Sequence, residues 1–127
     1  MNIDKLNLST VYLVLDGTNI TNKQQFLSSI GTLLKFPDYY GHNWDALDEC
    51  LGNIVSIWEQ ENPTFIYPFI DVLDAIDKDL TVNVIWIKPE IMLNNNSEDF
   101  FSAVDILRQA NIDKTPLNFY LANYIGR

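Results

Sequence analysis

Apolar residues are concentrated in three short runs along the chain, each rich in branched or aromatic side chains. Residues 11–15, VYLVL, form the first run, which Asp16 and Gly17 close with a typical turn pair. Residues 82–87, VNVIWI, and residues 117–121, LNFYL, form the other two. Runs of this kind are typical of buried strands, so the sequence predicts three strands.

A first helix is predicted between the first two runs, where apolar residues recur every three or four positions. Thr21, with Gln24 three residues later, has the form of a capping box, so we expect the helix to begin there. The pair Phe36-Pro37 predicts its end. The apolar face expected of this helix consists of Phe26, Leu27, Ile30, Leu33 and Leu34.

Two more helices are predicted in the second half of the chain. Pro68 is a typical first residue of a helix, and Ser97, followed by two acidic residues, has the composition of a helix start. Their expected apolar faces are Phe69, Val72, Leu73 and Ile76 for the first, and Phe100, Phe101, Val104 and Leu107 for the second. The three asparagines at 94–96 indicate a loop, and the pattern assigns no element to residues 54–67.

The order of these elements indicates the fold class. Strands that alternate with helices favour a parallel sheet joined by helical crossovers, so we expect an α/β fold with a three-stranded parallel sheet and helices packed on it. A chain of 127 residues can bury a substantial core, and no repeat or linker interrupts it. We therefore expect a single domain over residues 1–127.

Residues 36–51, FPDYYGHNWDALDECL, combine aromatic and acidic side chains in one short segment. With Asn43 as the N-cap and about 100° per residue, the helix that follows it has two distinct faces. The apolar face consists of Trp44, Ala46, Leu47, Cys50, Leu51 and Ile54. Asp45, Asp48 and Glu49 lie together on the opposite face, so we expect their carboxylates to point to solvent.

The negative charge of the chain is concentrated around this segment. Residues 36–77 contain nine acidic residues and no lysine or arginine, whereas the rest of the chain contains eight acidic and eight basic residues. The formal net charge of -9 therefore arises from one stretch. A pI near 4.2 argues against direct binding of nucleic acid and favours a basic protein surface as partner.

The remaining composition excludes several other classes of protein. At 47% hydrophobic and 20% charged residues, the chain differs from a disordered one, and its apolar runs are too short to span a membrane. The N-terminal residues do not have the pattern of a secretory signal, and a single cysteine cannot form an intramolecular disulfide. These features predict a soluble protein of the reducing cytoplasm.

Three functions of the acidic helix face are compatible with the pattern. The charge can serve solubility alone, or it can form a binding surface whose carboxylates pair with cations of a partner. The aromatic residues Tyr39 and Tyr40 and the ring of His42, next to the acids, favour the binding surface. Catalysis by two of the carboxylates is disfavoured, because such pairs flank a substrate in a cleft rather than project from a convex helix face. We therefore expect a protein that is not an enzyme.

Segment 36–51 resembles the loop and second helix of the barstar family, whose members are intracellular inhibitors of small ribonucleases. The resemblance lies in the tract YYG, in Asn43, in Asp45-Ala46-Leu47 and in Cys50-Leu51, which agree in identity and spacing. Residues 103–121 are similar to the last helix and strand of the family without a gap. The stretch around residues 56–79 looks like an insertion after the second helix.

The resemblance implies a barstar-like α/β fold and a stoichiometric inhibitor of a basic ribonuclease. Such an inhibitor lays its second helix and the preceding loop across the active site of the nuclease, where carboxylates replace substrate phosphates. It implies that Tyr39 is an aromatic contact, Asp45 an acidic contact and Glu49 the acid that enters the catalytic pocket. Asp113 corresponds to a further acidic contact.

The sequence departs from the family pattern at four positions. The central acid is Glu49 rather than an aspartate, and Asp48 replaces an aromatic contact. Ile54 replaces another aromatic residue, and Gln109 replaces an acid in the last helix. The implied partner is therefore a basic ribonuclease that differs from the partner of the family's best-known member, or another basic toxin protein. The alternative function is a barstar-like interaction module, or an immunity protein of a toxin–antitoxin pair whose toxin is not a ribonuclease.

The remaining reactive or large side chains have structural interpretations. Cys50 lies on the apolar side of its helix, which predicts a buried structural thiol. His42 has no second metal ligand at a usual spacing, so a contact in the loop or interface is expected. Trp44 and Trp86 are expected in the core, whereas Trp58 fits either the core or the surface. No motif for a metal, a cofactor or a catalytic nucleophile is present in the sequence.

Overall fold

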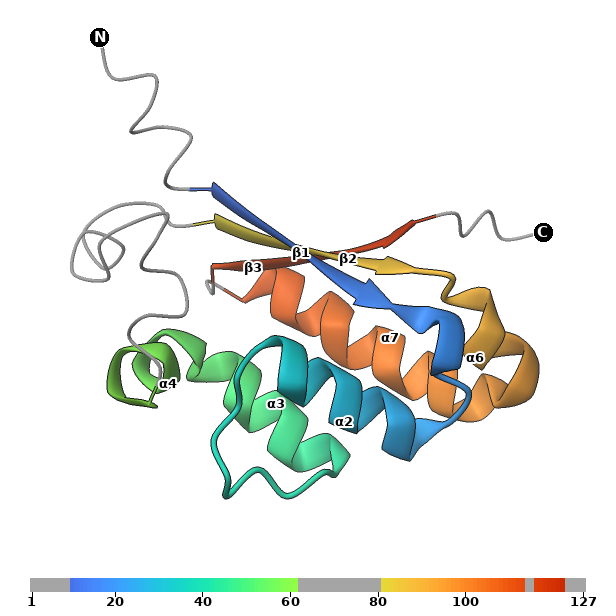
Figure 1. The fold of residues 1–127 in the computed structure, drawn as a ribbon, viewed down its shortest axis with the longest axis horizontal. Helices are drawn as coiled ribbons and strands as arrows, with labels where there is room; N and C mark the ends of the chain where they lie inside the picture. Colours follow the sequence, from blue (N-terminus) through green and yellow to red (C-terminus); the bar gives the residue numbers. More distant parts are fainter. Residues whose placement is uncertain (1–9, 62–80, 114–115, 123–127) are drawn as a thin grey trace, which may run out of the picture.

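Three parallel strands form one layer of the computed structural model, which describes residues 10–61, 81–113 and 116–122 (Figure 1). The strands are β1 (Thr10–Asp16), β2 (Thr81–Ile87) and β3 (Leu117–Ala122), in the order β1-β2-β3. Their register pairs Leu13 with Val84 and Val84 with Phe119. The predicted three-stranded parallel sheet is thus confirmed.

The described helices connect or flank these strands. They are the 3-10 helix η1 (Gly17–Asn19) and the α-helices α2 (Lys23–Leu33), α3 (Trp44–Gly52), α4 (Ile54–Glu61), α6 (Glu90–Asn95) and α7 (Ser97–Ile112). Figure 1 shows α2, α3 and α7 on the same side of the sheet. On the other side, the described strands expose Tyr12, Val14 and Tyr120. None of the described helices is both long enough and apolar enough to cross a membrane.

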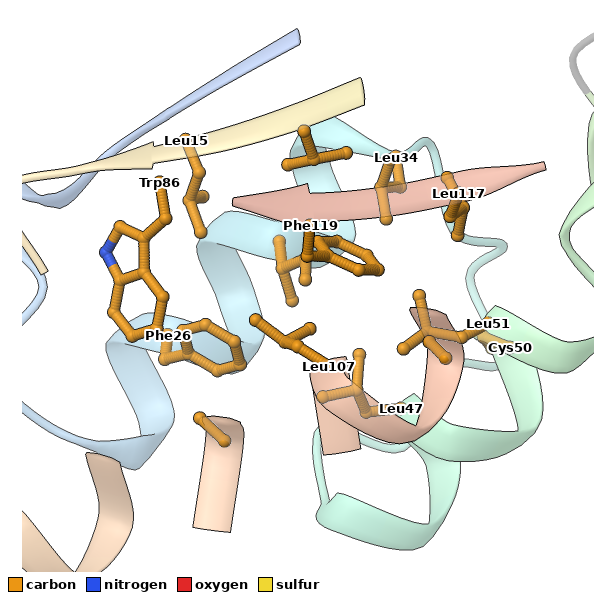
Figure 2. Packing of buried hydrophobic residues seen from close by; sticks show 14 of the residues in the cluster. Leu15, Phe26, Leu34, Leu47, Cys50, Leu51, Trp86, Leu107, Leu117 and Phe119 are labelled. Atoms are coloured by element: carbon orange, nitrogen blue, oxygen red, sulfur yellow. The ribbon is translucent and has the colours of Figure 1, made fainter. Parts of the chain in front are cut away.

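The hydrophobic core fills the space between the sheet and these helices (Figure 2). At one end, the ring centroid of Trp86 lies 5.0 Å from that of Phe26 and 5.5 Å from that of Phe100, which joins β2 to α2 and α7. At the other end, Leu47 and Leu51 of α3 are fully buried. Truncating a buried aromatic or leucine side chain costs about 2–5 kcal/mol, so the inner face of α3 is fixed firmly to the core.

The first helix begins one residue later than predicted. Asn22, not Thr21, is the N-cap, and its Oδ1 accepts a hydrogen bond of 2.9 Å from the backbone N–H of Gln25. The Gln25 side chain in turn accepts hydrogen bonds of 2.7 Å from the backbone N–H and the hydroxyl of Thr21. The Gln25 side chain therefore binds the residue before the N-cap, while Asn22 caps the helix. The predicted apolar face is buried except for Leu33, which is half-buried.

Residues 54–61, to which the pattern assigned no element, form α4. Only Asn53 separates α4 from α3, and the N–H of Ile57 donates to the Asn53 carbonyl at 3.0 Å. Trp58 is fully buried, and its Nε1–H donates to the Leu34 carbonyl at 2.7 Å. Of its two possible places, Trp58 therefore occupies the core.

Two further predictions were wrong, and one lies outside the described residues. Asn94 and Asn95 belong to α6 rather than to a loop, and Asn95 Nδ2 donates to the Ile91 carbonyl at 2.7 Å. Phe101 is 53% exposed although it was expected to point inward, because the position after Phe100 is rotated by about 100° away from the core. The helix predicted from Pro68 lies in the part of the chain that the structure does not describe.

Candidate functional site

The chain leaves α2 through a helix-ending turn that directs it into the loop before α3. The Phe36 N–H donates to the Gly31 carbonyl at 2.9 Å, and the Lys35 N–H lies 3.4 Å from the Thr32 carbonyl. Lys35 has a φ of 58°, in the left-handed region. This is the hydrogen-bond pattern of a Schellman motif, which fixes the direction of the chain after the helix.

Tyr40 holds the loop against α2. Its hydroxyl donates to the Leu27 carbonyl at 3.1 Å, and its ring lies 4.8 Å from the ring of Phe36 in an edge-on arrangement. An added Cβ at Gly31 would lie 2.7 Å from Tyr40 Cε2, so only glycine leaves room for this ring. Burial raises the pKa of Tyr40, as expected for a phenol that donates to a carbonyl inside the protein.

Tyr39 and His42, on either side of this anchor, project outward. Tyr39 is 73% exposed, and His42 is also exposed. His42 has a φ of 53°, and its Nδ1 lies 3.0 Å from the Tyr40 carbonyl oxygen, where the Nδ1–H tautomer donates a hydrogen bond. Its ring centroid is 4.5 Å from that of Tyr40. The buried tyrosine therefore positions both exposed side chains.

The helix α3 begins at the predicted N-cap and buries three residues of the predicted face, whereas Ala46 is half-buried and Ile54 belongs to α4. Asn43 Oδ1 accepts a hydrogen bond of 2.8 Å from the Ala46 N–H. The inner face contributes Leu47, Cys50 and Leu51 to the core. Burial, with a smaller contribution from the charge of Glu49, raises the pKa of the Cys50 thiol, so this thiol stays neutral in the structure. The prediction of a buried thiol is confirmed.

Trp44, the first residue of α3, is half-buried rather than fully inside the core as predicted. Its ring centroid lies 6.1 Å from that of Phe26, and Lys23 Nζ lies 5.3 Å from the indole centroid. The ammonium group thus covers the face of Trp44 by a cation–π interaction. Trp86, in contrast, is buried as expected.

The carboxylates of Asp45, Asp48 and Glu49 are all exposed on the outer face of α3. No lysine, arginine or histidine side chain within the described residues forms an ion pair with them. Asp45 lies in the first turn, where the helix dipole stabilises negative charge, but Asp48 and Glu49 lie three and four residues further on and repel it. The helix therefore presents a cluster of negative charge that its own described neighbours do not neutralise.

Asp113 lies apart from this cluster along the chain, directly after α7. Its carboxylate is exposed and accepts a hydrogen bond of 3.2 Å from Gln109 Nε2. Five of the six predicted site residues thus come from the loop and α3, whereas Asp113 comes from another element. Gln109, which replaces an acid of the family pattern, interacts with the acid four residues later.

The comparison with known families decides the assignment of the chain. The sequence model described as Barstar (barnase inhibitor) matches residues 10–122, which include all three strands and the acidic helix. The chain belongs to the barstar family. No curated protein sequence matches it. Barstar family members are inhibitors rather than enzymes, and they bind barnase-type ribonucleases, so membership supports a protein partner and an inhibitory role.

The chemistry available at the loop and α3 is that of recognition. The exposed groups are carboxylates, a phenol and an imidazole, all of which can pair with cations or donors of a partner. Within the described residues, no group of three or more histidine, cysteine, aspartate or glutamate side chains is placed to hold a metal ion. Sequence reasoning did not single out Asp38, Ser28 and Thr32, which border a hollow beside the loop.

Proposed function

We propose that the protein is a stoichiometric inhibitor of a basic ribonuclease in the cytoplasm, whose active site it blocks with α3 and the preceding loop. The proposed contact residues are Tyr39, His42, Asp45, Asp48, Glu49 and Asp113. In this role the carboxylates take the positions that substrate phosphates occupy in the nuclease. The partner's lysine, arginine and histidine side chains then pair with them.

One observation carries this proposal: the three carboxylates of α3 are exposed and form no ion pair within the described residues. An acidic cluster that its own protein leaves unpaired attracts a cationic cleft and accelerates association, an effect for which the type pair of this family is a standard example. The anchored Tyr40 supports the proposal further, because a loop already held in position loses less entropy on binding.

The partner is proposed to differ from that of the type member. The side chain of Glu49 is one methylene longer than the aspartate that the type member has at this position, so its carboxylate reaches further from the helix. Asp48 places a negative charge where the family pattern has an aromatic contact. Both changes favour a nuclease whose active site is wider and more strongly basic.

The proposal is tested by titrating the protein into a fixed concentration of a ribonuclease and following hydrolysis of a fluorogenic RNA substrate. Barnase is the first nuclease to use, because the family description names it, followed by basic ribonucleases encoded beside the gene. Activity should fall linearly and reach zero at one equivalent of inhibitor. Full nuclease activity at a large excess of inhibitor, for every nuclease tested, would refute the proposal.

The alternative is a barstar-like interaction module or an immunity protein against a partner that is not a ribonuclease. Those departures from the family pattern that change the binding face favour this alternative function. This alternative predicts a complex that forms through the same surface without any loss of ribonuclease activity. Binding measured by calorimetry, together with the hydrolysis assay, separates the two functions.

A further inference from the structure

A hollow of about 220 Å³ lies between α2 and the loop that precedes α3. The helix contributes Ser28 and Thr32 to its lining, and the loop contributes Asp38, Tyr40 and His42. The hollow therefore adjoins the candidate site through His42 but faces α2 rather than α3.

The groups around this hollow are suited to a cation. Of the described residues that line it, only Asp38 carries a formal charge at neutral pH when histidine is neutral. Within the described residues its carboxylate forms no ion pair. The two hydroxyls add oxygen acceptors, and the faces of nearby aromatic rings attract cations.

The walls of the hollow are held in place by contacts with the core. Tyr40 is fixed by its hydrogen bond to the Leu27 carbonyl and by the close approach of Gly31, and the Tyr40 N–H donates to the Pro37 carbonyl at 2.9 Å. Phe36 packs edge-on against the same ring. A hollow built in this way exists before any partner arrives, which lowers the entropic cost of filling it.

A second, larger hollow of about 490 Å³ shares Asp38 with the first and is also bordered by Tyr39. It is also lined by Lys35, so its charge is mixed. Among the described residues, no lysine or arginine lines the smaller hollow. A cation is therefore favoured in the smaller one.

We propose that the smaller hollow accepts an arginine side chain of the partner nuclease, so that the interface extends from α3 over the loop onto α2. This inference rests on the proposed function and adds Asp38, Ser28 and Thr32 to the contact surface. Arginine fits better than lysine, because its planar guanidinium group stacks on aromatic rings and donates two parallel hydrogen bonds to a carboxylate. Continuity with the candidate site through His42, together with the complementary charge, identifies this occupant.

The test is an NMR titration of the full chain with N-acetyl-arginine amide, with the uncharged N-acetyl-citrulline amide as the matched probe. The arginine compound should cause saturable shifts of the backbone amide signals of Ser28, Thr32 and Asp38, whereas the citrulline compound should not. Asp38→Asn should weaken this binding at least fivefold, while the control Asp105→Asn, on α7, should leave it unchanged.

Shifts confined to residues 45–49, or shifts at the hollow that Asp38→Asn does not reduce, would overturn the inference. A second measurement uses the nuclease that the protein inhibits, with Asp38→Asn expected to weaken inhibition more than Asp105→Asn. Equal effects of these two variants would overturn the inference but leave the proposed function intact. A wild-type protein that inhibits no ribonuclease would instead refute the proposed function, and the titration would still decide whether the hollow takes a guanidinium group.

Discussion

Replacing Glu49 by alanine should weaken the complex with the partner nuclease without unfolding the inhibitor. The Glu49 side chain is exposed and adds nothing to the core, so the free energy of unfolding should change by less than about 0.5 kcal/mol. Loss of its repulsion with Asp45, four residues earlier, should even stabilise α3 by a few tenths of a kcal/mol.

The effect on binding should be much larger, because the cation that Glu49 meets is left buried and unpaired in the complex. Truncating one partner of such a charge pair costs about 2–5 kcal/mol, and the type pair of this family is among the complexes behind that range. We expect a loss of at least about 2 kcal/mol, which corresponds to roughly 30-fold weaker binding. Asp45→Ala should have an effect of the same order.

Affinity is measured by inhibition titration or calorimetry at one fixed ionic strength, and stability by urea unfolding of the free proteins. Asp105→Ala is the matched control, since it removes the same charge from an exposed position on α7. Its contact with Arg108, at 4.0 Å on the surface, contributes little to stability. Affinities within twofold of wild type for both Glu49→Ala and Asp45→Ala would refute the assignment of the surface.

Three further changes have defined outcomes. Tyr40→Phe removes the donor to the buried Leu27 carbonyl, so the free energy of unfolding measured in urea should fall by about 1–3 kcal/mol, and unchanged stability would show that the hydrogen bond does not hold the loop. Added salt should slow association with the nuclease far more than it speeds dissociation in stopped-flow experiments, because it screens the attraction between opposite charges, and a salt-independent association rate would contradict this account. The raised pKa of the Cys50 thiol stabilises the fold at low pH, and this contribution should be lost as the pH rises from the ordinary thiol pKa of about 8.5 through the higher folded value. Over this pH range the free energy of unfolding should fall less steeply in Cys50→Ala than in the wild type. Equal slopes for the two proteins would show that the thiol does not cause this pH dependence.

The sheet and α3 could be predicted from the sequence because local signals and burial agree there. Asn43 is followed by residues that separate into an apolar and an acidic face, and the structure buries Leu47, Cys50 and Leu51 of the first and exposes the second. Each strand likewise carries a run of branched or aromatic residues, without the apolar spacing of three or four residues that is typical of a helix. In such segments a single local conformation satisfies both the backbone and the core.

Helix boundaries were less predictable where two helices follow each other without a loop. Asn53 alone separates α3 from α4, and Asn96 alone separates α6 from α7. Asparagine is common both in loops and at helix ends, so its presence does not distinguish the two. The apolar spacing of Ile54, Ile57 and Trp58 was a signal for α4, but it merges with the period of the preceding helix.

The outward acids of the candidate site followed from helix geometry, whereas the support beneath them did not. The contact between Tyr40 and Gly31 joins two segments through a tertiary packing arrangement that no local pattern encodes. The same holds for the hollow beside Asp38, whose walls come from α2 and from the loop. A sequence pattern identifies which side chains face outward, but not which backbone segments meet behind them.

The alternation of inward and outward residues between Tyr39 and Cys50 has a consequence for how such inhibitors diversify. Tyr40 and Cys50 maintain the scaffold, while Tyr39, Asp48 and Glu49 touch little of it. Mutations at the outward positions can therefore accumulate at almost no cost to folding. A lineage that faces a changing set of partner proteins can track them by altering only these few codons, as long as the tyrosine behind them is kept.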